Sequence, residues 1–148
     1  MPADLSGQWR NQHGSTMSLL IDAEGKVSGT YQTAVGSPDP TYQFAIRGFV
    51  LDDVIAFTVR WSNASGNYHS LTSWAGQMTL GSSNEDVIQT LWHLAADVPD
   101  PNEPATLWKA IWAGADDFRR TTTVAPPTPI NFANRPSFPL SLIPKKPK

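Results

Sequence analysis

Short runs of alternating apolar and polar residues follow one another along the chain, and turn-forming residues separate them. An alternation with a period of two is typical of a β-strand that has one side in the core and the other in water. The 3.6-residue period of a helix is weak almost everywhere. The sequence therefore predicts an all-β protein with eight strands, at Gly7–Gln12, Met17–Asp22, Lys26–Thr33, Tyr42–Leu51, Val54–Trp61, His69–Leu80, Asp86–Ala95 and Ala110–Thr122.

Most links between these strands are short. Hairpin turns are expected at "DAEGK" (Asp22–Lys26) and "LDDV" (Leu51–Val54). Strands joined in this way form an antiparallel meander, and closing the meander removes exposed strand edges. The expected fold is an eight-stranded antiparallel up-and-down β-barrel. The longer links, at 34–40, 62–68 and 96–109, should lie at the mouth of the barrel, where loops often carry function.

A proline-rich segment follows the last predicted strand. Residues 124–148 hold seven of the chain's 13 prolines, and proline donates no hydrogen bond to a sheet. We therefore divide the chain into a barrel, residues 1–123, and an extended Pro-rich C-terminal tail, residues 124–148. Because the tail also holds several large apolar side chains, two roles stay open: a flexible tail, or a segment that docks on its own or a neighbouring barrel.

Composition and charge argue against several classes of function. The net charge of −2 includes four positive charges after residue 134, so the first 134 residues carry −6, which is unsuited to nucleic acid. Without cysteine there is no thiolate nucleophile or thiolate metal ligand, and the three histidines lack metal-ligand spacing. No apolar run approaches the roughly 20 residues of a membrane helix. The first residues lack the basic start and apolar run of a secretion signal.

Strand parity indicates which side chains share the barrel interior. Residues two apart lie on one face of a strand, so Trp9 should face inward with Asn11, while Arg10 and Gln12 point outward. The same rule fills the interior with aromatic rings, hydroxyl groups and an amide. Burying such a polar group without a partner costs about 1–3 kcal/mol. Their convergence therefore predicts a ligand cavity, and an eight-stranded barrel is wide enough for one small ligand.

Six motifs, in order and at matching spacing, carry a resemblance to the avidin and streptavidin family of biotin-binding proteins, most closely to its bacterial members. The resemblance runs from Gly7 to Phe118. The motifs are "GQWRNQHGST" (7–16), "GTYQTAVG" (29–36), "FTVRWSN" (57–63), "HSLTSWAGQ" (69–77), "TLWHL" (90–94) and "LWKAIWAGADDF" (107–118). It implies the streptavidin-like barrel and a non-enzymatic, high-affinity biotin binder without a cofactor.

The resemblance also implies roles for residues at the ureido end of the ligand. Asn11, Ser15 and Tyr31 resemble the trio that donates hydrogen bonds to the ureido oxygen of biotin. Asp116 is similar to the carboxylate that accepts one ureido N–H and is coupled to the asparagine, and Thr33 stands where a hydroxyl accepts the other. Donors on the oxygen and acceptors on the nitrogens polarise the ureido group, and charge-assisted hydrogen bonds are the strong ones.

The rest of the implied site surrounds the sulfur, the chain and the carboxylate of biotin. Thr72 would meet the thioether sulfur, and Ser70 and Ser37 would take the carboxylate. The walls would come from three tryptophans, Trp61, Trp74 and Trp92. A fourth, Trp108, is similar to the tryptophan that caps the site of a neighbouring subunit. The resemblance thus implies a homotetramer, with a dimer or concentration-dependent oligomer as the alternative, and a secreted or periplasmic location.

Other interpretations stay open from the residues alone. Asn11, Gly14 and Ser15 could be ordinary turn residues. Trp108 and Trp112, four apart, would suit a short helical turn. The alternative function is a lipocalin-like carrier of another small apolar ligand, which shares the barrel but would favour an apolar cavity over the polar cluster. An enzyme lacks support because no nucleophile lies at motif spacing from a histidine and an acid.

Overall fold

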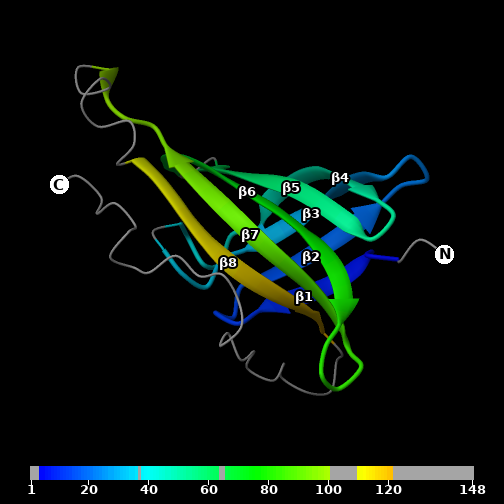
Figure 1. Ribbon diagram of the computed structural model, residues 1–148. Helices are drawn as coiled ribbons and strands as arrows, with labels where there is room; N and C mark the ends of the chain where they lie inside the picture. Colours follow the sequence, from blue (N-terminus) through cyan, green and yellow to red (C-terminus); the bar gives the residue numbers. More distant parts are fainter. Residues whose placement is uncertain (1–3, 37, 64–65, 101–109, 122–148) are drawn as a thin grey trace.

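The chain folds into one closed barrel of eight antiparallel strands, each hydrogen-bonded to the next, with β1 and β8 closing the ring (Figure 1). This computed structural model describes residues 4–36, 38–63, 66–100 and 110–121. The strands are β1 (Gly7–Asn11), β2 (Thr16–Ile21), β3 (Lys26–Gln32), β4 (Phe44–Leu51), β5 (Val54–Asn63), β6 (Gly66–Leu80), β7 (Asp86–Ala96) and β8 (Ile111–Arg120). The predicted up-and-down topology is confirmed. In these ranges, no helix has the length and hydropathy needed to cross a membrane.

The predicted strands agree with the observed ones to within a few residues, with one larger difference. The segment 62–68 was expected to be a long link, but β5 extends to Asn63 and β6 begins at Gly66, and these two residues pair. A register shift between Arg60 and Ser62 makes this possible, since a bulge takes up an extra residue without ending the ladder. β4 also begins two residues later than expected, at Phe44.

The seam that closes the barrel has the shortest ladder. Among the described residues, β1 and β8 pair at three positions, Trp9 with Arg120, Arg10 with Arg119 and Asn11 with Phe118. By contrast, β6 and β7 pair continuously from Leu80 opposite Asp86 to Ser70 opposite Ala96.

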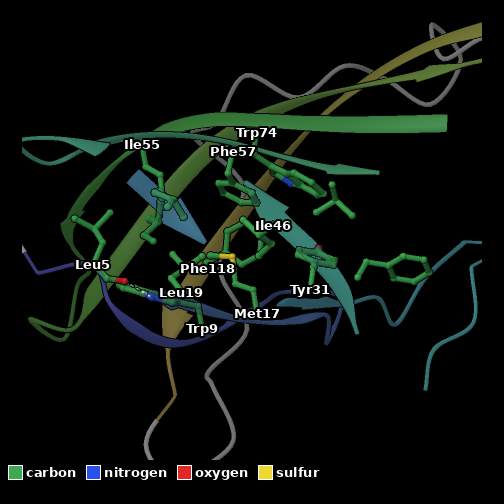
Figure 2. Close-up of a cluster of buried hydrophobic side chains, with 14 of the residues drawn as sticks. Leu5, Trp9, Met17, Leu19, Tyr31, Ile46, Ile55, Phe57, Trp74 and Phe118 are labelled. Carbon is green, nitrogen blue, oxygen red and sulfur yellow. Dashed lines mark hydrogen bonds between the residues drawn. The ribbon is translucent and has the colours of Figure 1, made fainter. Parts of the chain in front are cut away.

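One end of the barrel is filled by the hydrophobic core. Figure 2 shows Leu5 and Trp9 at one end of this cluster and Tyr31 and Trp74 toward the other. The Trp9 indole donates to the carbonyl of Leu5 at 3.0 Å, and the Arg120 guanidinium lies 4.3 Å from the centre of the Trp9 ring. Because Arg120 also donates to the carbonyls of Asp4 and Ser6, the N-terminal segment is held across this end. Several buried polar side chains, among them Asn11, Thr33, Thr72 and Asp116, lie toward the opposite end.

Candidate ligand-binding site

A cavity of about 1020 Å³ opens at the end of the barrel opposite the core. Ligand pockets usually measure about 300–1,000 Å³, so the space suffices for a small molecule. Nine of the predicted site residues line it: Asn11, Tyr31, Thr33, Trp61, Ser70, Thr72, Trp74, Trp92 and Asp116. Ser15 is fully buried behind the wall. Ser37 and Trp108 lie outside the described residues.

Asn11 ends β1 and holds the turn that follows it. Its side-chain oxygen accepts hydrogen bonds from the backbone N–H groups of His13, at 3.0 Å, and Ser15, at 2.9 Å. Gly14 completes the turn with a φ of 88°, in the left-handed region that glycine tolerates best. With the oxygen engaged, the amide nitrogen is fixed in orientation and lies 3.4 Å from the Tyr31 hydroxyl. Asn11 therefore has both a turn role and an N–H group at the cavity.

Tyr31 and Ser15 lie beside this amide. The Ser15 hydroxyl accepts the backbone N–H of Ala34 at 2.9 Å, which ties the β1–β2 turn to the end of β3. Burial raises the pKa of the Tyr31 phenol well above its usual range; the negative charge of Asp116 adds to this, and a hydrogen bond with Ser15 opposes it. Tyr31 thus keeps its proton at physiological pH and remains available as a donor.

Asp116 on β8 is held by groups on two sides. Its Oδ2 accepts the indole N–H of Trp74 at 2.9 Å, and its Oδ1 accepts the side-chain amide of Gln12 at 3.0 Å. Its carbonyl accepts the hydroxyl of buried Thr90 at 2.8 Å. The carboxylate is thereby fixed at the cavity wall with little exposure to water. Its expected coupling to Asn11 stays a prediction.

Gln12 was predicted to point outward, and this is wrong. Its amide nitrogen also donates to the carbonyl of Ala115 at 3.0 Å, and its amide oxygen accepts the backbone N–H of Asp117 at 3.1 Å. Gln12 follows the last residue of β1, so strand parity no longer sets its direction. Its side chain lies across to β8 and clamps the segment that carries Asp116.

Two threonine hydroxyls on the wall have part of their hydrogen-bonding capacity fixed. Thr33 donates to the carbonyl of Val35 at 2.7 Å and accepts the Val35 N–H at 3.2 Å. Its proton is therefore engaged and a lone pair remains for a ligand donor. Thr72 instead accepts the indole N–H of Trp61 at 2.7 Å, which leaves its own proton to donate.

The aromatic wall is braced by ring contacts. Trp74 lies between Phe57, stacked at 5.0 Å and 12°, and Tyr31, at 5.0 Å and 30°. Trp61 meets Trp74 edge to face at 6.5 Å. Trp92 lies over Gly114 of β8, where a Cβ would lie 2.9 Å from the indole nitrogen and closer still to ring carbons. The absence of a side chain at Gly114 thus provides the space for that indole.

Several lining residues were not among the predicted site. The mouth is formed by side chains that include Tyr68, whose hydroxyl accepts the backbone N–H of Asp39 at 3.2 Å. Trp112 is in strand β8 opposite Leu94 and lines the cavity, so a helical turn at this position is wrong. Parity applied to β8 would have placed Trp112 inward, two residues from Gly114. His13 also lines the cavity, beside Asp116; no sequence pattern indicates the direction of a turn side chain.

The site has the character of a binding pocket for a neutral, partly polar molecule. One end offers N–H and O–H donors beside a fixed carboxylate, and the remaining walls are aromatic. Within the described ranges, no three histidine or acidic side chains come close enough to hold a metal ion. A flat head group with a carbonyl oxygen and N–H groups would satisfy the donors and the acceptors together.

Comparison with known proteins gives consistent results. The model of the Avidin family matches residues 1–121. Afifavidin from Afifella pfennigii is 33% identical over 126 residues, which cover 84% of this chain and 74% of that protein. Among solved structures, a rhizavidin–biotin complex is 33% identical, with a TM-score of 0.67, covering 78% of this chain and 99% of that one. A complex of short afifavidin with biotin is 33% identical, with a TM-score of 0.65, covering 79% and 89%.

Proposed function

Because this chain belongs to the avidin family, we propose that it binds biotin tightly and noncovalently in the open end of its barrel. Proteins of this family are non-enzymatic, and biotin is the bound ligand in the related rhizavidin and short afifavidin complexes. The single observation that carries the proposal is the fixed carboxylate of Asp116 beside the donors of Asn11 and Tyr31. This arrangement complements a ureido group, which presents both N–H groups and a carbonyl oxygen.

The geometry supports a role for each residue at the ureido end. Asn11 has its side-chain oxygen engaged by the turn and its amide nitrogen 3.4 Å from the Tyr31 hydroxyl, so an amide N–H is left to donate to the ureido oxygen. Tyr31 stays a neutral phenol and donates to the same atom, with Ser15 behind it. Asp116 and Thr33 accept the two ureido N–H groups. Biotin thus meets donors on its oxygen and acceptors on its nitrogens.

The remaining contacts follow the length of the ligand. Thr72, whose hydroxyl oxygen accepts the Trp61 indole N–H, would donate its proton to the thioether sulfur, and Ser70, farther along β6, would meet the carboxylate. The rings of Trp61, Trp74 and Trp92 enclose the bicyclic head and the chain. Ser37 and Trp108 complete the proposed set, the second as a cap on a neighbouring subunit's site.

Calorimetric titration with biotin tests the proposal on the wild type and on Tyr31→Phe. The variant loses one hydroxyl and keeps the ring that packs on Trp74, so affinity should fall by about 10-fold or more. Tyr42→Phe is the matched control, because Tyr42 packs on Phe44 and does not line the cavity. A wild type that binds no biotin, but binds an apolar ligand, would instead support a lipocalin-like carrier.

We further propose that the protein is a homotetramer, with a dimer as the alternative. Outward-facing residues of five adjacent strands form an uncharged row across the barrel: Phe49, Ala56, Ala75, Leu91 and Ala115. Phe49 is 68% exposed and Leu91 41%. An apolar face of this kind supports association with another copy.

Measured mass at nanomolar and micromolar protein tests this assembly. Leu91→Arg should dissociate the oligomer, whereas Leu20→Arg on β2, also at an exposed leucine, should not. An unchanged mass in Leu91→Arg would rule out this face as the interface. A secreted or periplasmic location and a bacterial source rest on the family resemblance alone, and fractionation of the source cells would test the location.

A further inference from the structure

His13 lies at the polar end of the cavity, in the turn between β1 and β2. Its Nε2 is 4.0 Å from Oδ1 of Asp116, the oxygen that also accepts the Gln12 amide. The two side chains differ in exposure: 53% of His13 is accessible to water, against 7% of Asp116. A titratable group therefore borders the proposed ligand and lies near the carboxylate that would hold it.

We propose that His13 sets the affinity of this site through its protonation state, so that the neutral imidazole permits tight binding and the imidazolium weakens it. This inference rests on the proposed binding of biotin at Asp116. The chemistry needed is a neutral ligand that donates an N–H to a carboxylate and covers the histidine as it binds.

Competition for the carboxylate is the first reason. A protonated imidazole has N–H groups on both ring nitrogens and a positive charge. At 4.0 Å from Oδ1 it needs only a small movement to donate to Asp116. The carboxylate then accepts from Gln12, Trp74 and His13 together. Less of its charge and fewer of its lone pairs remain for a ligand N–H.

Desolvation is the second reason, and it acts in the same direction. The Asp116 side chain is already largely buried without a ligand, so a bound ligand adds little to the free-energy cost of burying its charge. His13 still has half of its surface in water, and a ligand seated on Asp116 would cover much of it. Covering an imidazolium costs more free energy than covering a neutral imidazole. Binding therefore favours release of the proton, and affinity falls as the pH is lowered.

The other ionisable groups near His13 do not reverse this direction. Tyr31 on β3 remains a neutral phenol. Arg10 on β1 places its guanidinium beside Gly14, the next residue of the same turn. Asp117 on β8 contacts Gln12 through its backbone N–H. At the mouth, His69 and Asp97 line the same cavity, and a hydrogen bond joins their backbones.

The test measures the dissociation constant of a biotin amide, whose side chain has no ionisable group, between pH 8 and pH 5. For the wild type we expect a loss approaching 10-fold per pH unit once histidine is protonated. His13→Asn is uncharged throughout and should show a nearly flat profile. His93→Asn, at an exposed histidine on the outer face of the barrel, should follow the wild type.

A His13→Asn variant that keeps the wild-type loss, or a wild type without any loss, would overturn the inference. If His13→Asn fails to fold, as judged by its thermal transition, His13→Leu replaces it. Proton release on binding, measured at pH 6 in buffers of different ionisation enthalpy, gives an independent readout. A wild type that binds no biotin amide at pH 8 would refute the proposed function itself, and so differs from failure of the pH dependence alone.

Discussion

The Gln12 clamp gives the sharpest test of how the fold holds the site. Gln12→Met keeps the length and volume of the side chain but removes three hydrogen bonds, to the carbonyl of Ala115, the carboxylate of Asp116 and the N–H of Asp117. A neutral hydrogen bond contributes about 0.5–1.5 kcal/mol, and one to a charged group about 1.5–3 kcal/mol. Since Gln12 is only half buried, water replaces part of this.

We therefore expect the free energy of unfolding of Gln12→Met to fall by about 2–4 kcal/mol, measured by urea denaturation. The corresponding decrease in Tm is roughly 10 °C. Biotin affinity should fall as well, because Asp116 loses the donor that fixes Oδ1. Both effects come from one side chain that makes no proposed contact with biotin.

Gln77→Met is the matched control for this experiment. Gln77 also donates its amide to a carboxylate, Oδ2 of Asp53 at 3.1 Å, but on the exposed outer face of the barrel. Such a surface interaction contributes little, so the change should stay within about 0.5 kcal/mol. Equal destabilisation by Gln12→Met and Gln77→Met would refute the clamp, as would undiminished biotin affinity in Gln12→Met.

Three further predictions concern the wall and the phenol. Gly114→Ala should displace the Trp92 indole and lower biotin affinity by about 10-fold or more. Ala113→Ser, opposite exposed His93 on the outer face, should leave affinity unchanged, and calorimetry compares the two variants. Trp74→Phe keeps an aromatic ring on Phe57 but removes the N–H donor to Asp116, so biotin affinity should fall by about 10- to 150-fold. Unchanged affinity would mean that the indole N–H is not needed for binding. The pKa of Tyr31 is raised in the folded state, so its contribution to stability is complete below the usual tyrosine pKa of about 10 and is lost as the pH rises above that value. The free energy of unfolding, measured by urea denaturation from pH 8 to pH 11, should therefore decline. The decline should be smaller in Tyr31→Phe.

The strands and most of the cavity wall were predictable because alternation fixes both. Once Trp9 is placed inward, Asn11 must follow, and the same rule orients Tyr31 and Trp74. Prediction failed where that rule stops. Gln12 belongs to a turn, where the direction of a side chain depends on tertiary hydrogen bonds that no local pattern shows.

At Trp112 the sequence predicted a strand, which is confirmed, and left a helical turn as the alternative. Its distance of four residues from Trp108 fits either structure, and the continuous pairing of β8 with β7 decides between them. The link at 62–68 failed for a related reason. Asn, Ser and Gly residues favour a link, but they do not show how far a bulged ladder extends from each strand, here to Asn63 and Gly66.

The short ladder between β1 and β8 has a consequence for how ligand and fold depend on each other. Among the described residues the seam joins three residue pairs, extended by a hydrogen bond from the Thr121 N–H to the Gln8 carbonyl, and this is the shortest ladder of the barrel. Asn11 lies on one side of that seam and Asp116 on the other. A biotin molecule that hydrogen-bonds to both would therefore connect β1 and β8 in addition to their backbone hydrogen bonds, and would oppose separation of the two strands.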